Sequence, residues 1–146
     1  MSPRTRERTA NQGEEGILEL CELLLARGVG IEAGLLHLND AYGFVNSGLV
    51  DRCVRVLLEP LDAEPAAAVA HAEAMERVLA EADVSLEQIH HGDDIATWHV
   101  MARALKRGHG TRAGLEDTTR LPDGRLAPDN ASLVKVAAEM IARESG

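Results

Sequence analysis

Residues 29–35 read Val-Gly-Ile-Glu-Ala-Gly-Leu, a short apolar run with a single acid at Glu32. A run of this length and composition, bounded by glycine, is typical of a buried parallel strand. Side chains alternate between the two faces of a strand, so Ile31 and Ala33 share one face and Glu32 lies on the other. The run therefore predicts a strand with one apolar face and one face that carries charge.

Two later runs repeat this alternation. In the first, Arg55 and Glu59 share the face opposite three apolar side chains. In the second, Arg112 and Glu116 share the face opposite Ala113 and Leu115. We expect the apolar faces to pack on helices and the charged faces to point the other way. An internal network of ion pairs among these four residues is the structural alternative to a functional site.

Helical patterns separate the strands. The expected elements are a helix over 14–27, a strand over 29–35, a helix from a cap at Asn39 to 45, a strand over 53–59, a helix over 66–82 after Pro65, a strand over 87–91, a helix over 95–107, a strand over 111–116 and a helix from a cap at Asn130 to 143. Residues 1–12 are polar and expected to be loose. We expect residues 1–146 to form one domain, in which 13–146 make a helix followed by four strand-helix units.

Strands that alternate with helices imply parallel pairing with right-handed crossovers. Two architectures meet this condition, an open doubly wound sheet and part of a closed barrel. In a doubly wound sheet helices cover both faces, so buried charges would be costly. In a (β/α)₈ barrel, also called a TIM barrel, charged groups at the carboxyl ends of the strands are where catalytic residues lie. The pattern favours the barrel, and 146 residues fall well short of the roughly 250 of a complete one.

The composition excludes several classes of protein. The formal net charge of −9 disfavours nucleic acid as a partner. No run of 18 apolar residues predicts a membrane span, and no apolar segment after the basic first residues predicts a signal peptide, so we expect a cytoplasmic protein. Cys21 and Cys53 are isolated and are expected to be small buried hydrophobic residues without a disulfide.

Three blocks of sequence resemble a known family. They are Gly28-Val-Gly-Ile-Glu-Ala-Gly-Leu35, then His91-Gly-Asp93 with Ala96-Thr-Trp98, then Thr111-Arg-Ala-Gly-Leu-Glu-Asp-Thr118 with Leu121-Pro-Asp-Gly124 and Asn130-Ala131. In order and spacing they are similar to the β-keto acid cleavage enzymes, the family of the 3-keto-5-aminohexanoate cleavage enzyme. The resemblance runs from about Asn11 to the end of the chain, and the third block is its most specific part.

The resemblance implies a zinc-dependent (β/α)₈ barrel that exchanges acyl groups between a small β-keto acid and acetyl-CoA, giving acetoacetate and a new acyl-CoA. By the same resemblance, Glu116 is the metal ligand and Asp117 the acid/base residue. Arg112 is the residue that stabilises the reacting oxyanion, and Glu32 is an acid of the substrate pocket. In such a site zinc polarises the keto oxygen, a carboxylate moves a proton and an arginine stabilises negative charge.

Two departures from the family pattern limit these expectations. Thr118 stands where asparagine is common, and the His-x-His pair that completes the zinc site is absent. His90 and His91 are adjacent, so they cannot replace that pair on one strand face. His91 precedes a glycine at a strand end, where it could reach the pocket or serve a structural role.

We therefore expect the C-terminal half of a barrel, with strands five to eight. Its partner would be a second copy of this chain or a separate N-terminal half-barrel chain. The alternative is a non-catalytic remnant, or a scaffold that associates with itself through its open strand edges.

Overall fold

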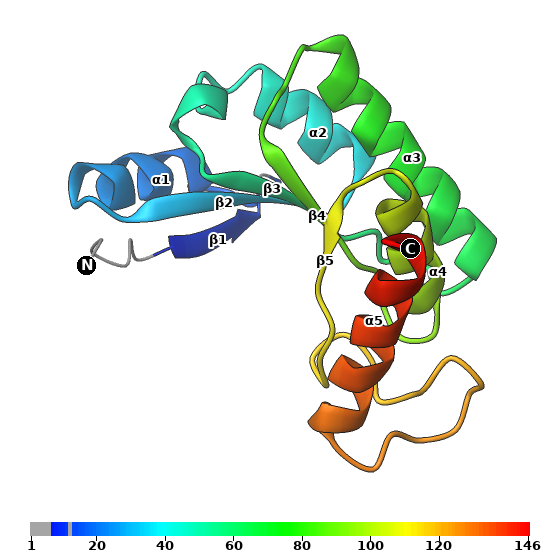
Figure 1. The fold of residues 1–146 in the computed structure, drawn as a ribbon. Helices are drawn as coiled ribbons and strands as arrows, with labels where there is room; N and C mark the ends of the chain where they lie inside the picture. The colour runs from blue at the N-terminus through cyan, green and yellow to red at the C-terminus, as the bar shows by residue number, and fades with distance from the viewer. Residues whose placement is uncertain (1–6, 12) are drawn as a thin grey trace.

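The computed structural model describes residues 7–11 and 13–146 and has an alternating α/β architecture (Figure 1). The elements are β1 Glu7–Asn11, α1 Ile17–Ala26, β2 Gly30–Leu35, α2 Leu38–Val45, the 3₁₀ turn Val50–Arg52, β3 Arg55–Leu58, α3 Pro65–Glu81, β4 Glu87–His90, α4 Ala96–Lys106, β5 Gly110–Thr111 and α5 Asn130–Glu144. In this described part, no helix is both long and apolar enough to cross a membrane.

The sheet has five parallel strands in the order β1-β2-β3-β4-β5, so each strand pairs with its neighbours in the sequence. A sheet that adds every strand on the same side through right-handed crossovers carries its helices on one face. Figure 1 shows α1, α2 and α3 along the same side of the sheet. A doubly wound sheet reverses its strand order and has helices on both faces, so this architecture is excluded for the described strands. The sequential order is consistent with consecutive strand-helix units of a barrel.

β1 corrects one expectation. Residues 7–11, expected to be loose, pair in register with residues 30–34 of β2. This strand was not predicted because its residues are mostly polar and form no apolar run. Backbone pairing with β2 and the burial of Ala10 against the main core stabilise it instead. Residues 1–6 and 12, which were also expected to be loose, lie outside the described residues.

The core lies between the sheet and the helices. Ile31, Ala33 and Leu35 of β2 are fully buried with Val56 and Leu58 of β3, as the alternation of side chains predicts. The same cluster contains Cys21 and Cys53, which are buried, as expected. A second cluster joins α4 to α5 around Trp98, Met101 and Leu133. The charged face of each strand is the one turned away from the helices.

Two helix caps differ from expectation. Asp40, rather than Asn39, organises the start of α2, because its Oδ2 accepts the backbone N–H groups of Leu36 and His37 at 2.9 Å each. At α5 the cap is Asp129, which accepts the N–H of Ser132 at 2.8 Å. In both places two neighbouring residues had suitable side chains, and the observed hydrogen bonds identify the one that caps the helix.

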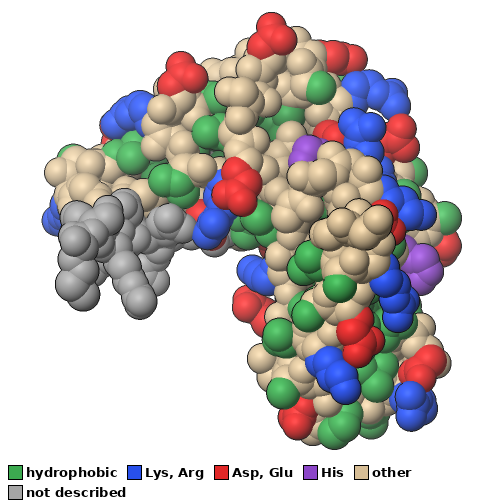
Figure 2. Space-filling model, in the orientation of Figure 1, with side chains coloured by type: hydrophobic (Ala, Val, Ile, Leu, Met, Phe, Trp, Pro, Cys, Tyr) green, Lys and Arg blue, Asp and Glu red, His purple; other side chains and the backbone are tan. Residues whose placement is uncertain are grey.

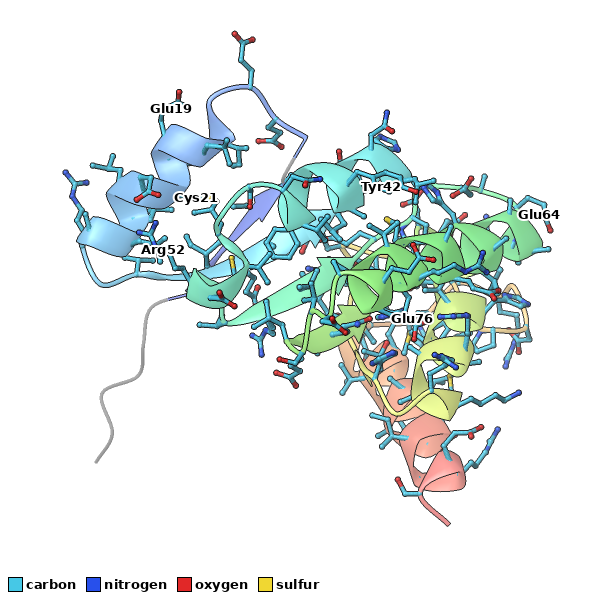
Figure 3. All side chains as sticks on the ribbon, turned by 90° about the horizontal axis from the view of Figure 1, so that it is seen from above. Glu19, Cys21, Tyr42, Arg52, Glu64 and Glu76 are labelled. Carbon is cyan, nitrogen blue, oxygen red and sulfur yellow. The ribbon has the colours of Figure 1, made fainter. Side chains whose placement is uncertain are left out.

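A buried acid joins α3 to α4. Glu76, which Figure 3 labels where these helices meet, accepts hydrogen bonds from Arg103, Arg107 and His109. Burial alone would raise its pKa, but these three partners lower it to about 2. The His109 ring stacks on His90 with the ring centroids 4.7 Å apart. This cluster therefore ties the two helices to the end of the sheet through charge and hydrogen bonds.

Candidate active site

Three charged or ionisable residues follow directly on three neighbouring strands. Glu59 is the first residue after β3, His91 the first after β4 and Arg112 the first after β5. The last strand residues, Leu58, His90 and Thr111, are aligned in register. The following side chains therefore form one row at the carboxyl edge of the sheet, on the face away from the helices.

β5 is shorter than expected, and this changes how Glu116 and Asp117 reach the row. The strand was predicted over 111–116 but ends at Thr111. The N–H groups of Asp117 and Thr118 both donate to the Gly114 carbonyl, at 3.0 and 3.2 Å, so the chain turns there. Strand parity thus does not position Glu116, and the turn brings both acids to the cavity instead.

The row and this turn line a small cavity of about 140 Å³. Its walls are the polar residues Glu59, His91, Asp93, Arg112, Glu116 and Asp117, with Leu61 and Gly92. Arg112, Glu116 and Asp117, three of the four residues suggested by the sequence, thus lie around one space. The fourth, Glu32, lies elsewhere.

Glu32 belongs to a deeper row of the same face. In register it lies beside Arg55, which lies beside Glu87. Glu32 and Arg55 form an ion pair, and Arg55 also approaches Glu87 at 3.8 Å. Because Arg55 precedes Glu59 by four residues, the two rows are about 13 Å apart. The four-residue ion network considered from the sequence is wrong in its pairing: Arg55 pairs with Glu32 and Arg112 with Asp117 instead.

Arg112 and Asp117 form the strongest pair of the cavity. Arg112 Nη2 donates to Asp117 Oδ1 at 2.5 Å and Nε donates to Oδ2 at 3.3 Å, a two-point contact. The Asp117 side chain is 3% exposed and that of Arg112 is 36% exposed. The hydrogen bond to Asp117 raises the pKa of Arg112, so the guanidinium stays charged. Arg112 Nη1 makes no hydrogen bond to any described residue and remains free to bind an anionic oxygen.

His91 lies between two carboxylates. Its Nδ1 is 3.3 Å from Asp117 Oδ1, and its Nε2 is 3.2 Å from Glu59 Oε2. Burial alone would raise the pKa of Glu59, but His91 and then Arg112 lower it overall. A comparison of the strand ends in register would have placed Glu59 and His91 at the site with Arg112. The sequence alone does not reveal that register.

The loop after β4 supports the site from the helix side. The Asp94 N–H donates to the Asp117 carbonyl at 2.8 Å, and Thr118 Oγ1 donates to Asp94 Oδ1 at 3.2 Å. Asp94 has φ +44°, a strained conformation for a residue with a side chain. A Cβ at Gly92 would come within 3.0 Å of Thr97 Cα, so a side chain at this position would crowd the backbone at the start of α4. Packing against the start of α4 therefore fixes the backbone beside His91.

The described residues supply one candidate zinc ligand. Glu116 is exposed at the cavity and makes no ion pair with a described residue, so its carboxylate is available. Within residues 7–11 and 13–146, no group of three or more His, Cys, Asp or Glu side chains could hold a metal ion. These residues by themselves therefore do not fit a zinc ion, and any zinc site needs ligands from another segment or chain.

A larger depression of about 540 Å³ lies between α4, α5 and the loop that precedes α5. Trp98, Leu121, Val136 and Met140 make its lining mainly apolar. Trp98 is 4% exposed and donates through Nε1 to the Arg120 carbonyl. We place the site at the smaller cavity because its acid, base and cation are held in contact with one another.

Comparison with known proteins gives one family match. A model of the beta-keto acid cleavage enzyme family matches residues 17–146. A comparison with curated proteins finds no match. The family match covers every residue of the cavity.

Proposed function

Because the chain belongs to the beta-keto acid cleavage enzyme family, we propose that it takes part in zinc-dependent cleavage of a β-keto acid by acyl exchange with acetyl-CoA. The bond between the keto carbon and the carboxymethyl group of the substrate breaks. The carboxymethyl group joins the acetyl group to give acetoacetate, and the remaining acyl group leaves as a CoA thioester. Acetyl-CoA as cosubstrate fits the cytoplasmic location expected from the sequence.

One observation carries this proposal: Arg112, Glu116 and Asp117 line a single cavity at the carboxyl edge of a parallel sheet. Asp117 would move a proton to or from the substrate, since its carboxylate is held by Arg112 and faces the cavity. Arg112 would bind the developing oxyanion through Nη1. Glu32 would contact the far end of a substrate that reaches the deeper row.

Zinc and the closed barrel belong to the proposal. Glu116 would be one zinc ligand, with a His-x-His pair from a further segment or from a second chain. The five described strands would then be continuous with early strands of a (β/α)₈ barrel, of which β2–β5 are strands five to eight. The edges of the sheet at β1 and β5 are unpaired with each other among the described strands, so further strands have a place to add.

The test is zinc content together with an acetyl-CoA-dependent cleavage assay. We expect the purified chain to hold little zinc and show no turnover, and a complementary first-half chain to restore both. Glu116→Ala should then abolish zinc binding in the restored complex, because one of the metal ligands is lost. Glu73→Ala, an exposed acid of α3, is the matched control and should bind zinc as before. Failure of the complemented chain to bind zinc or to turn over would overturn the proposal.

The second candidate function is a scaffold that associates with itself. The observation in its favour is the open sheet, since exposed parallel edges invite pairing with another chain. Self-association without zinc or turnover, even with a first-half partner, would support the scaffold over the enzyme.

A further inference from the structure

The proposed reaction leaves two polar residues of the cavity without a role, of which His91 is buried and Glu59 partly buried. His91 has a side chain that is 4% exposed, and Glu59 one that is 15% exposed. Ionisable groups are seldom buried to this extent unless a partner offsets the loss of water. Both lie in the same row as Arg112, directly after their strands.

The His91 ring joins the two carboxylates geometrically. Its Nδ1 faces Asp117 Oδ1 at 3.3 Å and the Gly92 carbonyl at 3.4 Å, while its Nε2 faces Glu59 Oε2 at 3.2 Å. The orientation toward Glu59 does not complete a hydrogen bond, and neither His91 Nε2 nor Glu59 Oε1 has a hydrogen-bond partner among the described residues. The two groups are thus within ion-pair distance and buried together.

The charges around His91 indicate which protonation form of its ring fits between the two carboxylates. A neutral imidazole carries a proton on one nitrogen only, so one carboxylate would face a lone pair. A doubly protonated ring gives each carboxylate a proton-bearing nitrogen. With Arg112, the order Glu59, His91, Asp117, Arg112 then alternates acid and base and has no net charge. The lowered pKa of Glu59 agrees with an ionised carboxylate beside a cation.

We propose that Glu59 and His91 are positioning residues of the site: Glu59 holds the His91 ring in its doubly protonated form, and His91 fixes the Asp117 carboxylate against Arg112. This inference rests on the proposed function for the part that Asp117 plays in catalysis. The arrangement keeps Asp117 Oδ1 in one place between two cations, so that its carboxylate presents a constant face to the cavity. Asp93 and Glu116 line the same cavity and add negative charge around the ring.

The form of the ring can be measured without zinc, acetyl-CoA or a partner chain. We would label the full chain with ¹⁵N-histidine and record the ring nitrogen shifts of His91 near neutral pH, assigned with His91→Gln. We expect the imidazolium pattern in the wild type and a neutral ring in Glu59→Gln. Glu87→Gln, which removes an exposed acid from the same face of β4, should leave the pattern unchanged. A neutral ring in the wild type, or an imidazolium that persists in Glu59→Gln, overturns the proposal.

Two further measurements keep the outcome clear. If Glu59→Gln does not fold, Glu59→Asp, which keeps a carboxylate, should retain the imidazolium, and its loss there would contradict the proposal. In the complemented enzyme Glu59→Gln should lower kcat about 10- to 100-fold with little change in KM, and Glu59→Asp should recover part of it; an unchanged kcat would contradict the role in positioning. Absence of wild-type turnover would overturn the proposed function, and the ring pattern would still decide the His91 pairing.

Discussion

At the scale of single residues, burial determines which groups keep their charge. His90 and His91 are neighbours, yet they point to opposite faces of β4 and meet opposite conditions. His91 faces two carboxylates in the cavity. His90 is fully buried on the helix side, where its Nε2 pairs with Gln88 at 2.9 Å. Burial, and then the nearby His109, lower the pKa of His90 to about 3.

This shift predicts that acid destabilises the protein. The unfolded chain binds a proton at His90 below a pKa of about 6.5, and the folded chain does so only near 3. The free energy of unfolding should therefore fall as the pH drops from 7, by about 2 kcal/mol at pH 5 for this residue. Urea unfolding at pH 7 and pH 5 measures the loss. His90→Phe should reduce it, whereas His99→Gln, which removes an exposed histidine, should not; equal losses in all three proteins would contradict the assignment.

At the scale of elements, the loop after β5 depends on the start of α5. Asn130 Oδ1 accepts the Leu115 N–H at 3.1 Å, which holds the turn that carries Glu116 and Asp117. Asp129, one residue earlier, caps the helix instead. Two adjacent side chains thus have separate tasks, one for the site loop and one for the helix.

Substitution of each residue should separate these tasks. Asn130→Ala should weaken protection of the Leu115 amide about 5-fold, the equivalent of about 1 kcal/mol for one hydrogen bond. Asp129→Ala should lower the free energy of unfolding by about 1 kcal/mol through loss of the cap and leave the Leu115 amide protected. Amide exchange by NMR and urea unfolding distinguish the two effects. If Asn130→Ala left the exchange of Leu115 unchanged, this hydrogen bond would not hold the turn.

At the scale of the whole molecule, apolar side chains are exposed on the surfaces of α1 and α5. Leu18, Leu20 and Leu23 of α1 are 47%, 46% and 48% exposed although Ile17 and Cys21 are buried, so α1 is apolar around most of its circumference. A helix of this kind is usually covered. Over α5, Figure 2 shows hydrophobic side chains between acidic and basic ones. α1 packs against β2 and β1 (Figure 1), and β1 is the edge strand of the described sheet, so the apolar surface of α1 lies near that edge.

These features predict that the chain self-associates when its complement is absent. Sedimentation should show a mass that increases with protein concentration. Leu20→Glu combined with Leu23→Glu should shift the protein toward the monomer, because charge on α1 opposes burial of that helix. Leu126→Glu changes a leucine that is 68% exposed in the loop before α5 and serves as the control. A wild-type monomer at all concentrations would contradict the prediction.

The sequence by itself determined the features that depend on near neighbours. Alternating side chains identified the helix-facing sides of β2 and β3, and Pro65 marked the start of α3 as observed. The motif that contains Arg112, Glu116 and Asp117 identified the family, because it is contiguous in the chain. These properties depend on residues that are close together in the chain, so they can be read from the sequence directly.

Only the tertiary structure decided what depends on distant segments. β1 forms because β2 offers it hydrogen bonds, although its own residues lack a strand pattern. β5 ends at Thr111 because the chain turns at Gly114 and is held there by Asn130. Glu59 and His91 join Arg112 because three strands, each separated by a helix, align in register. Register results from the packing of the whole sheet against its helices, and no short stretch of sequence contains it.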